Sequence, residues 1–171
     1  NGGGATASIN VAEGSTAITT ITATDADVPA QTLTYSIVGG TDSSFFSISS
    51  TTGSLSFISG RNFESPADAG ANNVYDVIVR VDDGMLWDDQ SIAVTITNVN
   101  EAPVLSPYSP TLPLTEDTAP YANTVAALLG ASVADADIGA VEGIAITSIS
   151  GSIGTLEYSL NGTTWTTVGS V

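Results

Sequence analysis

Two short acidic motifs in the sequence have the composition and spacing of divalent-cation ligands. Asp25-Ala26-Asp27 and Asp135-Ala136-Asp137 each place two carboxylates two residues apart, where a turning or extended backbone can direct both to one side. Two carboxylates about 4 Å apart repel each other by roughly 1 kcal/mol in water, and by more near a protein surface. Because Arg61 and Arg80 are the only basic residues, the repeated motifs favour neutralisation by a metal ion. The alternative for any single pair is an ordinary turn, in which Asp bonds to its own backbone.

The composition narrows the classes of function. Among 171 residues, 18 are acidic and 2 are basic, so the formal net charge is −16, which opposes binding to nucleic acid and to anionic lipid. The chain has no cysteine and no histidine, which excludes disulfides, thiolate metal sites and an imidazole base. No apolar run is long enough to cross a bilayer. We therefore expect no enzyme and no direct membrane insertion in this segment; the alternative interpretation of the acidity is solubility alone.

Strand patterns dominate the first hundred residues. Thr, Ser, Val and Ile alternate with a period of two, and Gly, Asn and Asp separate the runs. This pattern predicts an all-β fold, an antiparallel seven-stranded Greek-key β-sandwich. Ser50-Thr51-Thr52-Gly53 is expected to form a hairpin turn, and Asn62 to Asn73 a polar loop. The expected strands are Ala7–Val11, Ala17–Ala23, Thr32–Val38, Phe45–Ser49, Ser54–Ile58, Val74–Val81 and Ser91–Asn98.

A second unit is expected after the sandwich. We predict a β-sandwich domain over residues 1–100, a Pro-rich linker over 101–113 and a partial second β-repeat over 114–171. The second unit repeats the first in part, because Glu116 precedes its Asp-Ala-Asp motif much as Glu13 precedes the first. Its strands are expected at 144–149, 155–160 and 163–168, with Asn161-Gly162 as a two-residue hairpin turn. It is expected to be truncated.

Several motifs follow one another along the first unit, among them Phe46-Ser47-Ile48, Thr52-Gly53-Ser54-Leu55 and Asn62-Phe63-Glu64. The first two together resemble the hairpin of bacterial cadherin-type repeats from large surface adhesins, and the third stands where that family carries Asp-x-Glu. Tyr75 to Gly84 resembles the strand that ends in Asp-Gly, and Asn98 to Pro103 resembles the interdomain linker. The motifs occur in the family's order over nearly the whole first unit. The fold implied is a cadherin/immunoglobulin-like sandwich.

The resemblance implies calcium binding between consecutive domains. The first unit and linker would contribute Glu13, Asn62, Glu64, Asn98, Asn100 and Glu101, and the second unit Asp135 and Asp137. An opposite rim, facing a preceding repeat, would consist of Asp25, Asp27 and Asp83. The implied partners are calcium ions and neighbouring repeats of the same chain.

The function implied is a calcium-rigidified spacer or adhesion module, extracellular or on a bacterial cell surface. An alternative is a carbohydrate-binding module of a secreted polysaccharide-degrading or matrix protein, in which aromatic rings stack on sugars. The aromatic residues that would stack on sugar rings are Trp87, Trp165, Tyr108, Tyr121 and Tyr158. Another cell surface is a further candidate partner.

Overall fold

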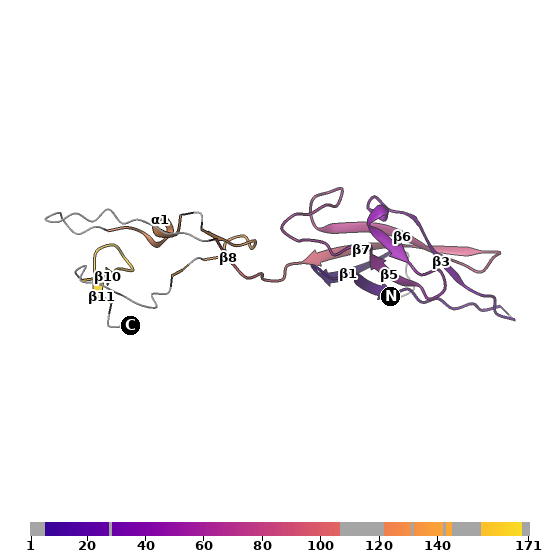
Figure 1. Cartoon of the computed structure of the whole chain (residues 1–171). Helices are drawn as coiled ribbons and strands as arrows, with labels where there is room; N and C mark the ends of the chain where they lie inside the picture. The colour runs from indigo at the N-terminus through magenta and orange to yellow at the C-terminus, as the bar shows by residue number, and fades with distance from the viewer. Residues whose placement is uncertain are drawn as a thin grey trace. The chain divides into compact units, whose positions relative to one another are not determined.

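The computed structural model describes residues 6–27, 29–106, 122–130, 132–141, 143–144 and 155–168. The chain divides into two compact units. One comprises the described residues up to Ala102 together with Ala136–Ile138, and the other comprises the described parts of Pro103–Asp135 and Gly139–Val171. The first unit holds the seven strands β1 to β7 (Figure 1). The predicted all-β sandwich is confirmed.

A long antiparallel hairpin forms the centre of the larger sheet. Strands β6 (Val74–Asp82) and β7 (Trp87–Thr97) pair along their whole shared length. Strand β3 (Thr34–Gly39) pairs antiparallel with β6, and β1 (Thr6–Ala12) lies on the other side against β7, giving the order β1-β7-β6-β3. The β1–β7 pair is parallel and so departs from the predicted antiparallel arrangement: both strands run toward the end of the unit where Ala12 pairs with Thr97.

A three-stranded sheet covers the larger one. Its order is β2 (Ala17–Thr20), β5 (Ser54–Phe57) and β4 (Phe46–Ile48), and a short 3₁₀ turn, η1 (Ser43–Phe45), precedes β4. The predicted hairpin between β4 and β5 is present, with the Gly53 N–H donating to the Ser49 carbonyl at 2.9 Å. Gly53 has a φ of +69°, and a Cβ there would lie 2.3 Å from the Ile21 carbonyl oxygen, so only glycine suits this turn.

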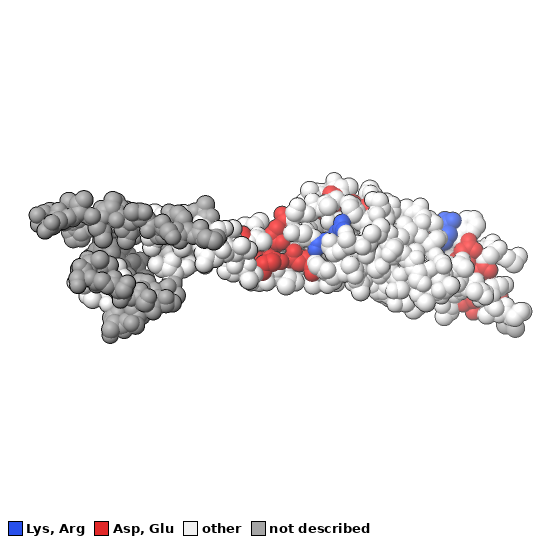
Figure 2. Space-filling view, viewed as in Figure 1, with Lys and Arg blue, Asp and Glu red and all other residues white. Residues whose placement is uncertain are grey.

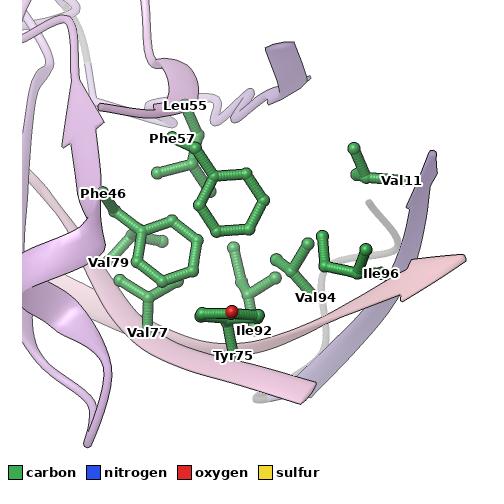
Figure 3. Packing of buried hydrophobic residues seen from close by; sticks show 10 residues of the cluster. All are labelled: Val11, Phe46, Leu55, Phe57, Tyr75, Val77, Val79, Ile92, Val94 and Ile96. Carbon is green, nitrogen blue, oxygen red and sulfur yellow. The ribbon is translucent and has the colours of Figure 1, made fainter. Parts of the chain in front are cut away.

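Alternating residues of the two sheets form one hydrophobic core. Val77 and Val79 point inward from β6, as the period-two pattern predicts, and their neighbours on the strand are more exposed. Tyr75 is fully buried and makes edge contacts with Phe45 and Phe57, each ring centroid 5.4 Å away. Figure 3 shows the cluster, whose members are Val11, Phe46, Leu55, Phe57, Tyr75, Val77, Val79, Ile92, Val94 and Ile96.

Strand β7 begins four residues before the predicted Ser91. Arg80 on β6 lies opposite Asp89 on β7, and its guanidinium donates to both carboxylate oxygens, at 2.7 and 2.8 Å. The same guanidinium lies 4.8 Å from the centroid of the Trp87 ring. This cross-strand pair extends the hairpin into a stretch whose acidic residues did not indicate a strand. The pKa of Asp89 is lowered by its hydrogen bonds to Arg80.

The second unit has short elements. Strand β8 (Val104–Leu105) pairs antiparallel with β9 (Val133–Ala134), and β10 (Glu157–Tyr158) with β11 (Thr166–Thr167). A five-residue helix, α1 (Val125–Leu129), was not predicted; Thr124 caps it by accepting from the Ala127 N–H at 3.0 Å.

The predicted two-residue turn at Asn161-Gly162 is wrong. Asn161 accepts from the N–H groups of Thr163 and Thr164, so it organises a longer loop between Tyr158 and Thr166. The expected strand at 144–149 falls almost entirely outside the described residues, as do Glu116 and most of the expected linker. The domain boundaries at 100 and 113 stay predictions. In the described part of the chain, no helix has the length and apolarity needed to cross a membrane.

Candidate metal centre

Three glutamates from separate segments meet at one end of the first unit. Glu13 follows β1, Glu64 lies in the loop between β5 and β6, and Glu101 follows β7. One carboxylate oxygen from each lies within 4.8 Å of the others. Figure 2 shows acidic side chains gathered at the two opposite ends of the first unit. The sandwich thus brings together carboxylates that are far apart in the sequence.

Glu13 holds the two segments that carry the other glutamates. Its Oε2 accepts from the Phe63 N–H at 3.0 Å, and its Oε1 accepts from the Val99 N–H at 2.7 Å. These backbone hydrogen bonds, from Phe63 first and then Val99, lower the pKa of Glu13. Glu13 is therefore held as a carboxylate beside Glu64 and Glu101.

The other two glutamates have buried oxygens without partners. Both carboxylate oxygens of Glu64 and the Oε2 of Glu101 are buried and make no hydrogen bond. The pKa of Glu101 is raised by burial, and next by the charges of Glu13, Glu64 and Asp137. Buried carboxylate oxygens are normally paired or bound to a cation. A set of carboxylate oxygens alone, with no nitrogen or sulfur, fits a hard ion such as Ca²⁺.

No arginine neutralises the three glutamates. The ion pair found among the described residues joins Arg80 to Asp89 on the β6–β7 hairpin, away from them. Arg61 is close in sequence to Glu64, but its guanidinium lies over the Phe45 ring, 5.0 Å from the centroid, and near Phe57. Neither Arg61 nor Arg80 therefore balances the negative charge of the three glutamates.

Asp137 joins the cluster through the segment Ala136–Ile138, which belongs to the first unit. Its Oδ2 accepts from the Glu101 N–H at 2.9 Å, and its Oδ1 accepts from the Asn98 side-chain amide at 2.9 Å. Asn98 therefore presents its side-chain nitrogen to Asp137. We call Glu13, Glu64, Glu101 and Asp137 the glutamate cluster.

The remaining predicted ligands of this site have other contacts. Asn62 accepts from the Ser65 N–H at 2.9 Å through its side-chain oxygen. The Asn100 side-chain nitrogen donates to the Glu101 carbonyl at 2.7 Å. Asp135 belongs to the second unit and stays a predicted ligand.

The predicted opposite rim forms a second cluster. Asp25, Asp27 and Asp83 each place a carboxylate oxygen within 4.8 Å of the others, beside an open hollow of about 300 Å³ that Leu86 and Trp87 also line. Asp25 accepts from the Asp27 N–H at 2.8 Å, so the turn considered as the alternative is present too. Asp83 accepts from the N–H groups of Leu86 and Met85, which lower its pKa in that order.

Three buried polar residues of the first unit were not predicted from the sequence. Asp42 is 2% exposed and accepts from the N–H groups of Ala69 and Asp76, joining the loop before β6 to β6 itself. Asp68 and Asn73 lie in or at the end of that loop and are also buried. The sequence signal that could have indicated Asn73 is the pair Asn72-Asn73 before the strand, since asparagine tolerates positive φ.

The aromatic residues considered for sugar stacking are partly accessible. Trp87 is 59% exposed, with Arg80 over its ring, while Trp165 and Tyr158 are 46% and 49% exposed in the second unit. Tyr108 and Tyr121 lie outside the described residues. The ring–ring contacts among the described residues involve the core rings Phe45, Phe46, Phe57 and Tyr75.

Comparison with known proteins gives matches at the level of family and fold. The family model described as "Cadherin domain" matches residues 7–100. No curated protein matches. Similar solved structures include human protocadherin-24 EC1-2 (22% identity, 57% of this chain and 43% of that one, TM-score 0.45). Another is Drosophila N-cadherin EC1-4 (21% identity, 58% of this chain and 25% of that one, TM-score 0.47).

This chain spans less than half the length of each of these two structures. The family match covers more than half of the 171 residues, and it coincides with the seven-stranded first unit. Cadherin domains are extracellular adhesion modules. The chain belongs to the cadherin domain family.

Proposed function

We propose that this chain is a calcium-binding, calcium-rigidified spacer or adhesion module of a bacterial cell-surface adhesin. The observation that supports it most is the set of buried, unpartnered carboxylate oxygens on Glu64 and Glu101 beside the charged Glu13. Cadherin domains typically bind calcium. The bacterial assignment rests on the resemblance of the first unit's motifs, such as Phe46-Ser47-Ile48 followed by Thr52-Gly53-Ser54-Leu55, to bacterial cadherin-type repeats.

The residues that would bind calcium form two groups. The glutamate cluster would hold calcium at one end of the unit, and Asp25, Asp27 and Asp83 would hold it at the other. Bound calcium supplies positive charge and coordination sites that carboxylates of neighbouring repeats can share. Without that charge, the carboxylates repel one another, which favours movement of the segment after β7 that carries Glu101.

Calcium titration tests the binding part of this proposal. Isothermal titration of the 171-residue chain should show saturable binding with a Kd of about 10⁻⁴–10⁻³ M, as in other extracellular calcium modules. Glu101→Gln should weaken the binding at one site by at least about tenfold, because it removes a carboxylate whose Oε2 is free for an ion. Glu157→Gln is the matched control, since this exposed glutamate lies on β10. No saturable heat, or equal weakening by both variants, would contradict the proposal.

Small-angle X-ray scattering tests rigidification separately. Calcium should change the scattering profile of the chain relative to chelator, and the maximum dimension should become better defined. Magnesium at the same concentration should have a smaller effect, because it resists dehydration and demands a strict octahedral ligand set. Superimposable profiles in calcium and chelator, together with measured calcium binding, would leave a calcium module without the proposed mechanical role.

A further inference from the structure

The residue before Glu64 is held through both of its backbone polar groups. The Phe63 N–H donates to Glu13 Oε2 at 3.0 Å, and the Phe63 carbonyl accepts from the Asn73 side-chain nitrogen at 2.8 Å. The second of these bonds acts on the peptide group that joins Phe63 to Glu64. The place of the Glu64 backbone therefore depends on Asn73, ten residues later in the chain.

Asn73 is itself attached to the large sheet. Its N–H donates to Asp68 Oδ1 at 2.9 Å, and its carbonyl accepts from the Ile96 N–H on β7 at 2.9 Å. Its exposed fraction is 9%, so the side chain has little freedom to turn into solvent. Asn73 thus connects the rigid β6–β7 hairpin to the loop that carries Glu64.

The backbone of Asn73 alone does not account for an asparagine here. Its φ of +63° suits glycine at least as well. The side chain also brings an unfavourable feature, because its Oδ1 is buried without a hydrogen-bond partner. The one contact that glycine could not make is the bond from the amide nitrogen to the Phe63 carbonyl.

We propose that Asn73 is a positioning residue of the metal centre: its side-chain amide links the sheet to the Phe63–Glu64 peptide and so directs the Glu64 carboxylate toward Glu13 and Glu101. The inference rests on the proposed calcium function and adds to it a residue that touches no ion. Outer partners of metal ligands typically contribute about 10- to 100-fold to metal affinity. Asn73 should contribute at the lower end of that range, since Glu13 also holds Phe63.

The test replaces Asn73 while preserving its backbone. Asn73→Gly keeps the positive φ and removes the amide. Asn72→Gly is the matched control, because the Asn72 side chain accepts from the Val74 N–H within its own turn and makes no bond to Phe63. All variants are made in the 171-residue chain with Asp27→Asn, so that the second acidic cluster is weakened equally throughout. Affinity is measured by calcium titration, and Tb³⁺ luminescence lifetimes in H₂O and D₂O count the waters on the bound ion.

We expect Asn73→Gly to lower calcium affinity about tenfold and to increase the number of waters on Tb³⁺, with little effect from Asn72→Gly. In a Glu64→Gln background, Asn73→Gly should have no further effect on affinity, because it acts through Glu64. Unchanged affinity in Asn73→Gly, or an equal loss when Glu64 is already replaced, would overturn the inference.

Two further outcomes separate the inference from the function on which it rests. If Glu64→Gln alone leaves affinity and water count unchanged, Glu64 is not a ligand, and the proposed site and the inference both fail. If Asn73→Gly does not fold in chelator, Asn73→Asp is the second variant: it has the same shape and lacks the donor. Wild-type affinity and water count in Asn73→Asp would overturn the inference.

Discussion

Glu64→Gln should stabilise the protein in chelator and destabilise it in calcium, relative to wild type. Without an ion, the substitution removes the charge of a carboxylate whose two oxygens are buried without partners, so repulsion in the glutamate cluster falls. With calcium, the same change removes a ligand. An ion at a hundredfold excess over its Kd stabilises the folded state by about 2.7 kcal/mol. For a domain of up to about 100 residues, such as the first unit, that stabilisation raises the unfolding midpoint by roughly 10–20 °C.

Circular dichroism melts in saturating calcium and in excess chelator measure both halves of this prediction. Glu157→Gln serves as the control, because it makes the same chemical change on β10, in the other unit. Its midpoint should follow wild type under both conditions. A Glu64→Gln midpoint that falls in chelator as well as in calcium would show that Glu64 has a structural role unrelated to ions.

Tyr75→Ala should produce the largest loss of stability of any variant considered, by about 3–5 kcal/mol. Tyr75 is completely buried, and its ring contacts Phe45 and Phe57 edge-on. Its hydroxyl oxygen also accepts from the Ala67 N–H at 3.0 Å, so the loop that carries Glu64 is attached to the core at this point. Removing the side chain leaves a cavity and an unpaired N–H together.

Chemical denaturation followed by tryptophan fluorescence gives the free energy of unfolding for this variant. Ile58→Ala is the apolar control: Ile58 is 67% exposed and should change stability by less than about 0.5 kcal/mol. Tyr75→Phe separates the two contributions, because it keeps the ring and removes the hydroxyl. A loss below about 1 kcal/mol in Tyr75→Ala would mean that the core rearranges around the cavity.

The strands of the first unit could be predicted because each carries its own signal. Alternation in segments such as Val74–Val81 follows from one buried and one exposed face, and that pattern is local in sequence. The Gly53 turn was predictable for the same reason, since glycine permits positive φ. Features that depend on partners distant in the sequence could not be predicted. The early start of β7 needs Arg80 opposite Asp89, a pairing visible only once the hairpin forms.

The candidate site shows the same division. The family resemblance placed Glu13, Glu64 and Glu101 together, and the structure brings them together. It did not indicate which asparagines would present oxygen, because this depends on neighbours such as Asp137 and Ser65. The buried carboxylates of Asp42 and Asp68 were also missed. Their role is to accept backbone N–H groups of an irregular loop, and no sequence period marks such a role.

The parallel pairing of β1 with β7 has a consequence for how the domain carries mechanical load. The seven residues of β1 pair with Ser91–Thr97, and the chain enters β1 at one end of this ladder and leaves β7 at the other. A pull on the two ends of the domain therefore acts along the strands, across all the evenly spaced hydrogen bonds of a parallel pair at once. Such a ladder must break in shear, with many bonds sharing the force, rather than unzip one bond at a time.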